Sequence, residues 1–245
     1  ASWNERGLQK EIHPRHMPSL PAIPVMPRSE KKGEDMSLNL DGWTSPDRGA
    51  LFIVTGASGT GKTTLVREAL RRIPGVQFSV SATTRAPRAG ERDGVDYRFL
   101  SREAFDSAVE AGDFLEWAEV HGNRYGTLKA PVERALASGS SILLEIDRRG
   151  ASQVREKAPE AISIFILPPG LETLEQRLRD RSTDSEEVIR RRVADAMDQI
   201  QHCGSFDFLL VNNVLESAHD QFQAILIAAL LHQERRRAWV EKFTS

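Results

Sequence analysis

Eight consecutive residues, Gly56 to Thr63, carry the clearest capacity for chemistry in this sequence. They match the pattern G-x-x-x-x-G-K-[ST] at every fixed position. Glycines let backbone N–H groups turn inward around a phosphate, and a helix N-terminus adds partial positive charge. Lys62 is placed to reach the β- and γ-phosphates, and the Thr63 hydroxyl is a potential ligand for Mg²⁺. We therefore predict a site for a nucleoside triphosphate, because a glycine-rich turn without a ligand would leave the lysine and the threonine unexplained. The residues expected to line it are Gly56, Ala57, Ser58, Gly59, Thr60, Gly61, Lys62, Thr63 and Thr64.

A second group with phosphate-binding chemistry lies in segment 79–99. Arg85 and Arg88 are three residues apart in a stretch that Pro87 stiffens, and Tyr97 adds a phenolic hydroxyl. Arginine forks bind phosphate through paired hydrogen bonds, and a rigid backbone lowers the entropy cost of aiming them. Taken alone, however, the two arginines fit a solvated basic loop better than a site.

Two carboxylates, Glu145 and Asp147, stand two residues apart at the end of an apolar run. On a strand this spacing puts both on one face, and α/β sheets bind ligands at the carboxyl ends of their strands. The pair suits either the water shell of Mg²⁺ or contact with a second substrate. Ion pairs with Arg148 or Arg149 are the structural alternative, which the position at the strand end disfavours for the pair.

The rest of the pattern supplies elements that would position these groups. Residues 51–55 form a continuous apolar run before the glycine-rich turn, as in a buried parallel strand, and an amphipathic helix follows until about Pro74. Further strands are predicted at 77–81, 141–146, 162–167 and 208–211, and helices at 102–111, 129–137, 171–181, 186–201 and about 216–242. This alternation predicts an α/β fold with a mostly parallel sheet and helices on both faces.

The two ends of the chain have their own character. Residues 1–50 hold six of the 12 prolines, and such close spacing forbids a helix. We expect a flexible tail there, with a docking segment for a partner as the alternative, and one domain over residues 51–245. Near the C-terminus, the basic residues 235–237 are expected to form a solvated face of the last helix.

Bulk properties narrow the class of protein. A net charge of −2 gives no global signal for a nucleic-acid or anionic-membrane partner. The single cysteine, Cys203, excludes an intramolecular disulfide and suits a reducing cytosol. No apolar run approaches the roughly 20 residues that span a bilayer. We therefore expect a cytoplasmic protein without nucleic-acid or membrane partners, and the sequence leaves a homo-oligomer open.

Four further segments carry a resemblance to guanylate kinases of the bacterial type, namely 79–99, 114–127, 145–151 and 177–184. With the glycine-rich motif, the similarity runs from about residue 51 to 235. It implies a P-loop nucleoside monophosphate kinase with a GMP-binding subdomain near 84–130 and a lid near 180–195. It also implies a reaction in which the γ-phosphoryl group of MgATP passes to GMP, and to dGMP, giving ADP and GDP.

By matching position, the resemblance assigns residues to the acceptor. Those for the GMP phosphate would be Arg85, Arg88, Tyr97 and Tyr125, and those for the guanine Ser81, Glu116 and Thr127; Glu145 and Asp147 would contact GMP or the Mg²⁺ shell. The chemistry agrees, because one carboxylate accepts from both guanine N1–H and the exocyclic amine. Adenine presents an acceptor at N1, and an unpaired buried group of this kind discriminates by roughly 10⁴-fold. Without the resemblance, Glu116 would pass for a surface glutamate.

The resemblance also supplies a catalytic set. Arg177, Arg181 and Arg192 would reach the transferring phosphates, beside Lys62 and Arg85; the first two are i and i+4 on one predicted helix face. Asn212 would contact adenine, although an asparagine after a strand is as often a turn residue. We expect direct in-line attack by GMP, whose phosphate is already mostly a dianion and needs no general base. His121 is therefore assigned to the loop.

Four positions depart from the pattern usual in the family: Arg124, Arg149, Ser182 and Asn213. None removes a group with an assigned role. Two alternative functions stay open at this level. A non-catalytic guanylate-kinase-like interaction module would usually lack the complete P-loop, and a kinase for another acceptor, such as a phosphorylated sugar, should lack the paired Glu116 and Thr127.

Overall fold

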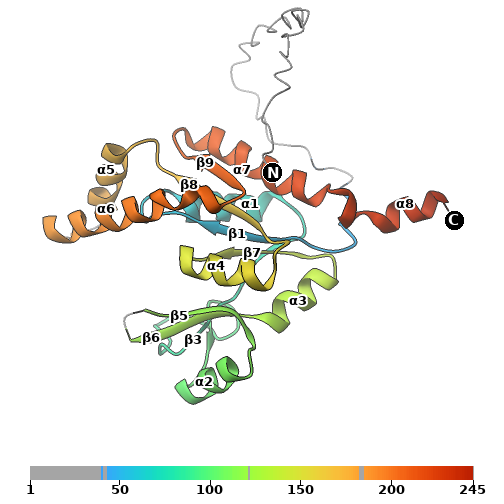
Figure 1. Ribbon diagram of the computed structural model, residues 1–245, viewed down its shortest axis with the longest axis horizontal. Helices are drawn as coiled ribbons and strands as arrows, with labels where there is room; N and C mark the ends of the chain where they lie inside the picture. The colour runs from blue at the N-terminus through green and yellow to red at the C-terminus, as the bar shows by residue number, and fades with distance from the viewer. Residues whose placement is uncertain (1–39, 41–42, 121, 182–184, 245) are drawn as a thin grey trace, which may run out of the picture. The chain divides into compact units, whose positions relative to one another are not determined.

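A five-stranded parallel sheet forms the centre of the fold in the computed structural model, which describes residues 40, 43–120, 122–181 and 185–244 (Figure 1). Its strand order is β2-β7-β1-β8-β9, and every neighbouring pair is parallel. The strands are β1 (Leu51–Thr55), β2 (Val76–Phe78), β7 (Ser141–Glu145), β8 (Ile162–Leu167) and β9 (Phe208–Val211). The predicted parallel sheet is confirmed, with the predicted bounds for β1, β8 and β9.

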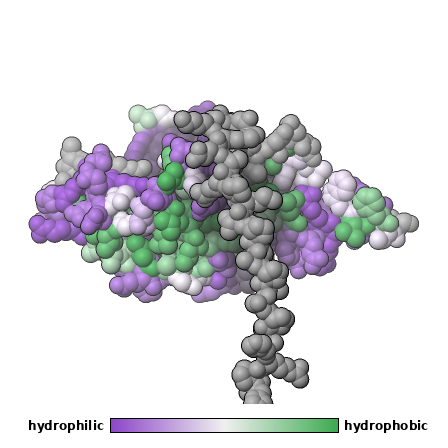
Figure 2. Space-filling model, turned by 90° about the horizontal axis from the view of Figure 1, so that it is seen from above, coloured by the Kyte–Doolittle hydropathy of each residue, from purple (hydrophilic) through white to green (hydrophobic). Residues whose placement is uncertain are grey.

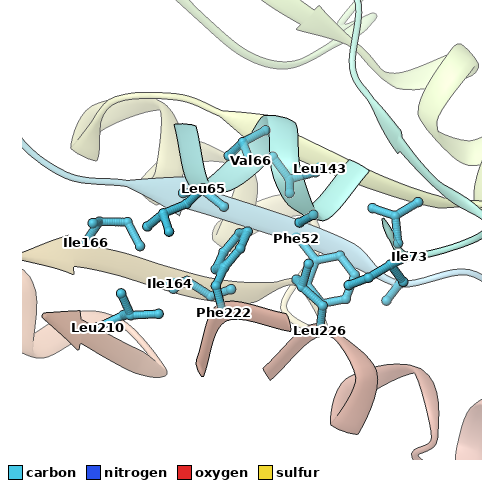
Figure 3. Packing of buried hydrophobic residues seen from close by; sticks show 14 of the residues in the cluster. Phe52, Leu65, Val66, Ile73, Leu143, Ile164, Ile166, Leu210, Phe222 and Leu226 are labelled. Atoms are coloured by element: carbon cyan, nitrogen blue, oxygen red, sulfur yellow. The ribbon is translucent and has the colours of Figure 1, made fainter. Parts of the chain in front are cut away.

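Both faces of this sheet are covered, as β1 in its middle requires. All five β1 residues are buried, and alternate side chains point to opposite faces. Phe52 and Val54 belong to a cluster with residues of α1 (Lys62–Arg72) and α7 (Leu215–Leu230), shown in Figure 3. Leu51 and Ile53 pack instead with α3 (Lys129–Ala137) and α4 (Arg148–Lys157). The two clusters hold β1 from both faces and so position the glycine-rich turn that follows it.

A second, smaller sheet occupies much of the stretch between β2 and α3. Its order is β4-β3-β6-β5, with β4 (Arg98–Phe99), β3 (Ala82–Thr83), β6 (Asn123–Leu128) and β5 (Phe114–Val120). Helix α2 (Arg102–Glu110) begins at the N-cap Ser101 and packs on this sheet through Phe105, whose ring stacks on Phe114 at 4.4 Å between centroids. The sequence analysis predicted α2 but none of these strands.

Two helices, α5 (Leu171–Arg181) and α6 (Glu186–Gln201), lie beside the glycine-rich turn. Leu174 and Leu178 of α5 and Ala196 of α6 form a small core with Ala57 of that turn. Both helices have the bounds predicted from sequence. Ser182 and His121 lie outside the described residues. The expected lid at 180–195 stays a prediction.

The C-terminal region differs from the single helix predicted over about 216–242. Helix α7 ends at Leu230, a short 3₁₀ turn follows (η2, Gln233–Arg235), and α8 covers Arg237–Thr244. The basic residues before α8 are also not a solvated face. Arg236 donates to the Thr44 hydroxyl and carbonyl oxygens at 2.8 and 2.9 Å, and Arg235 donates to the Gly49 carbonyl oxygen at 2.7 Å.

The last residues of the predicted tail are therefore anchored. Asp47 accepts a hydrogen bond from the Ala238 backbone N–H at the start of α8 (2.7 Å), and Ala50 lies in the core with no exposed surface. The Arg236 guanidinium also lies over the Trp43 ring. The folded part of the chain begins earlier than residue 51, because this segment satisfies donors of the C-terminal region.

Apolar side chains also reach the surface. Phe208, Leu209 and Val211 of the edge strand β9 are exposed. Figure 2 looks down on the side where Figure 1 places α7 and β9, and it shows an apolar area among hydrophilic residues. Within the described residues, no helix is long and apolar enough to cross a bilayer.

Candidate active site

The turn between β1 and α1 has the backbone of a phosphate cradle. Gly59 and Gly61 have φ values of 86° and 88°, in the left-handed region that favours glycine. A Cβ on Gly61 would lie only 2.3 Å from the Asn212 side-chain nitrogen, so a side chain there would also collide. Helix α1 begins at Lys62, directly after Gly61, so its free N–H groups face this turn.

Two polar side chains of α1 enter the cavity at this turn. The Lys62 Nζ donates to the carbonyl oxygens of Gly56 and Ala57, at 2.5 and 2.9 Å. The Thr63 hydroxyl donates to Glu145 Oε1 at 3.1 Å, so a hydroxyl and a carboxylate oxygen stand together. The cavity measures about 390 Å³ and is lined by Gly56, Ser58, Gly59, Gly61, Lys62, Thr63, Glu145, Ile146, Asp147 and Gln199.

Glu145 and Asp147 reach this cavity in different ways. Glu145 is the last residue of β7, whereas Asp147 lies beyond the strand as the N-cap of α4, where its Oδ1 accepts from the Gly150 backbone N–H at 2.8 Å. The expectation that both lie on the strand is thus wrong for Asp147. Within the described part of the chain, neither carboxylate forms an ion pair with Arg148 or Arg149. Hard oxygen donors at this position fit Mg²⁺.

A neighbouring cavity of about 320 Å³ lies between α5 and the residues that follow β9. The buried Asn212 side chain donates to the Thr60 carbonyl oxygen at 2.8 Å and so ties the end of β9 to the cradle. Arg177 donates through Nη2 to the Asn212 carbonyl oxygen at 3.2 Å. Its Nη1 is buried with no hydrogen-bond partner among the described residues, which is costly unless a ligand supplies an acceptor.

The other two arginines of the predicted catalytic set lie on α5 and α6. Arg181 is the last residue of α5, one turn after Arg177 as its spacing predicted. Arg192 is exposed on α6.

Arg85, Tyr97 and Tyr125 meet on the second sheet. The Arg85 guanidinium lies 5.3 Å from the Tyr97 ring centroid, and the two tyrosine rings are 6.1 Å apart, edge to face. Arg85 also donates to both Glu91 carboxylate oxygens, at 2.8 and 3.0 Å. The Glu91 hydrogen bond raises the pKa of Arg85, and Arg85 in turn lowers the pKa of Glu91. Arg88 is exposed and holds Glu91 through its backbone N–H.

Glu116 and Thr127 form a buried polar pair on the adjacent strands β5 and β6. They are cross-strand partners, and the Thr127 hydroxyl donates to Glu116 Oε1 at 2.6 Å. Both residues are buried, with Glu116 only 7% exposed. Burial raises the pKa of the Glu116 carboxyl above its usual value, and the Asp147 charge adds to the rise, while the Thr127 hydrogen bond opposes it. A carboxylate in this setting is prepared to accept hydrogen bonds from a planar donor.

Most of the predicted residues therefore lie in two groups, one at the cradle and one beside the second sheet, whereas Arg192 is exposed on α6. Sequence reasoning missed four residues that hold the second group: Glu91, Gly150, Gln153 and Lys157. Glu91 lies six residues after Arg85, and this spacing was the one signal available. Arg124, one of the four departures, pairs with Asp106 of α2 and lies over the Trp117 ring of β5.

Comparison with known proteins decides among the nucleotide-binding families. The sequence model of the family described as guanylate kinase matches residues 48–229. The chain belongs to the guanylate kinase family. Membership makes it a nucleoside monophosphate kinase, a GMP phosphotransferase, and nothing in the comparisons favours the non-catalytic alternative.

Individual guanylate kinases match most of the chain. The one from Aromatoleum aromaticum is 51% identical over 183 residues, which cover 75% of this chain and 90% of that protein. The one from Carboxydothermus hydrogenoformans is 46% identical over 77% of this chain and 92% of its own length. The crystal structure of guanylate kinase from Anaplasma phagocytophilum is 33% identical, covers 78% of this chain and 92% of its own, and superposes with a TM-score of 0.61.

Proposed function

We propose that this chain transfers the γ-phosphoryl group of MgATP to GMP, and to dGMP, through the two groups of residues described above. The observation that carries the proposal is the buried Glu116 carboxylate with the Thr127 hydroxyl at 2.6 Å. A buried carboxylate with one oxygen already satisfied needs donors for its remaining lone pairs. The guanine edge offers two adjacent donors, N1–H and the exocyclic amine, and we infer that Ser81 on the neighbouring segment completes the contact.

On the donor side, backbone N–H groups of residues 56–61 would surround the ATP phosphates, and Lys62 would exchange its carbonyl partners for phosphate oxygens. The unpartnered Nη1 of Arg177 would donate to the same phosphates. The adenine would lie in the cavity that Thr64 and Asn212 line.

The cation required by this proposal is Mg²⁺ held with ATP. The Thr63 hydroxyl would bind it directly, and Glu145 and Asp147 would act through its water ligands or on GMP. When bound, Mg²⁺ would neutralise charge on the β- and γ-phosphates.

On the acceptor side, Arg85, Arg88, Tyr97 and Tyr125 would hold the GMP phosphate. The Glu91 carboxylate accepts two hydrogen bonds from Arg85 Nη2, so we infer that it holds the guanidinium in position for a phosphate. A phosphate monoester has a second pKa near 6, so the GMP phosphate attacks as a dianion without a base. Lys62 and the arginines Arg177, Arg181 and Arg192 would offset the charge of the two converging anions.

The experiment is ADP release from MgATP with GMP, dGMP, AMP, CMP or UMP, for the wild type, Lys62→Ala and Glu116→Ala. Arg67→Ala, on the exposed side of α1, serves as the control. We expect activity with GMP and dGMP only, about a hundredfold or greater loss of kcat/KM in Lys62→Ala, and loss of guanine preference in Glu116→Ala. Activity confined to AMP or pyrimidine nucleotides would overturn the acceptor assignment.

A further inference from the structure

Helix α4 meets the guanine-reading strand β5 at a residue without a side chain. Gly150 lies buried in the first turn of α4. A Cβ placed on it would lie 3.0 Å from Glu116 Oε2 and 3.4 Å from Glu116 Cδ. A side chain at position 150 would therefore make an unusually tight contact with the carboxylate, which would have to give way by a few tenths of an ångström.

The neighbours of this contact have little freedom to move aside. Gln153, one turn further along α4, donates to the Trp117 carbonyl oxygen at 3.1 Å and accepts from the Trp117 backbone N–H at 3.2 Å. Lys157 donates to the Phe114 carbonyl oxygen at 2.9 Å. These contacts hold β5 on both sides of Glu116. The carboxylate is itself held by Thr127, so a methyl group at position 150 would shift the carboxylate or the strand by a few tenths of an ångström.

Local helix energetics do not explain the glycine. Gly150 has no positive φ that would require it, and glycine is the poorest helix former after proline. An alanine would suit α4 better if only the helix mattered. The glycine instead matches a requirement for room beside the Glu116 carboxylate.

We propose that Gly150 is a specificity-determining position, which sets the place of the Glu116 carboxylate and through it the preference for guanine. The proposal rests on the proposed function, since it concerns the base-reading group of that site. Helix α4 also begins at Asp147, which lines the phosphate cavity and accepts from the Gly150 N–H. One helix turn thus fixes the base reader relative to the cradle.

The test compares Gly150→Ala with Gly170→Ala, a control in which the new methyl group meets nothing within 4 Å. Displacing a charged hydrogen-bonding group should raise KM for GMP about tenfold to a hundredfold, with KM for ATP nearly unchanged. The preference for GMP over IMP, which lacks the exocyclic amine, should fall in Gly150→Ala and stay intact in Gly170→Ala. An unchanged KM and an unchanged preference in Gly150→Ala would overturn the proposal.

A second test adds Gly150→Ala to a Glu116→Asp background, and it stands even if the Gly150→Ala single variant folds poorly. Glu116→Asp shortens the side chain by one methylene and withdraws the carboxylate from α4. In that background, Gly150→Ala should add no further rise in KM for GMP and should raise the melting temperature, as alanine in a helix does. A higher KM for GMP or a lower melting temperature in the double variant than in Glu116→Asp would contradict the contact. A wild type inactive on GMP would refute the proposed function, whereas the melting temperatures would still report on the contact.

Discussion

At the scale of single residues, Glu116 combines two demands that conflict in the absence of ligand. Under the proposed function its carboxylate must be ionised to accept from guanine, yet burial raises its pKa, with the Asp147 charge adding to the effect. A buried charge without its full complement of donors destabilises the empty protein. This cost is typical of a binding group held ready for a substrate.

The pH dependence of stability tests this conflict. At a pH below the ordinary value of 4.5, Glu116 is protonated in the folded and unfolded states alike and contributes no difference. As the pH rises through the raised folded pKa, the native state must give up a proton that it binds more tightly than the unfolded chain, so stability is lost and the loss then levels off. Glu116→Gln has no such proton.

We therefore expect the free energy of unfolding of Glu116→Gln, relative to that of wild type, to rise as the pH increases above the ordinary carboxyl value of 4.5. Urea denaturation at a series of pH values measures it. A difference between the two proteins that stays constant across this range would show that the Glu116 pKa is not raised.

At the scale of elements, helices and strands with a clear local periodicity could be predicted from the sequence, whereas those that depend on contacts between distant residues could not. Apolar runs and amphipathic stripes predicted β1, β8, β9, α3, α5 and α6 with the observed bounds. The strands β3 and β4 have two residues each, too few for a periodicity; β3 exists through pairing with distant β6, and β4 through pairing with β3. Helix α4 was missed because Gly150 interrupts its pattern, and its N-cap Asp147 was read as part of the preceding strand.

The break between α7 and α8 is also a tertiary effect. No proline or glycine occurs between Leu231 and Arg236, so the sequence reads as a continuous helix. The chain turns where Arg235 and Arg236 bind the segment from Thr44 to Gly49. Hydrogen bonds between residues some 190 positions apart leave no local signature.

Arg236→Ala should consequently lower the free energy of unfolding by about 1–3 kcal/mol, since it removes two hydrogen bonds and the contact with Trp43. The adjacent Arg237→Ala is the matched control, because Arg237 is exposed. Chemical denaturation of the two variants measures the difference. Equal stabilities would mean that Arg236 does not anchor this segment.

At the candidate site too, groups of consecutive residues could be predicted, whereas contacts between distant residues could not. The cradle could be predicted in full, because its glycines, lysine and threonine are consecutive in sequence. Asn212 and Arg177 could be named only by resemblance, since their contact with the cradle joins residues far apart. The burial of Glu116 could not be predicted from the sequence, because it arises from β5, β6 and α4 together.

At the scale of the whole molecule, the boundary of the folded part can be tested by truncation. A chain that begins at Leu38 keeps Trp43, Asp47 and the other anchoring residues, and we expect its unfolding midpoint and kcat/KM to match those of the 245-residue chain. A chain that begins at Leu51 loses them and should be destabilised by about 3 kcal/mol or more. Thermal unfolding of both proteins separates these outcomes, and equal midpoints would contradict the anchoring role.

The most direct test of the account as a whole is identification of the products. Purified protein with MgATP and GMP should form ADP and GDP in equal amounts, followed by ³¹P NMR or by chromatographic separation of the nucleotides. Release of inorganic phosphate without GDP, or no turnover of GMP, would contradict the account.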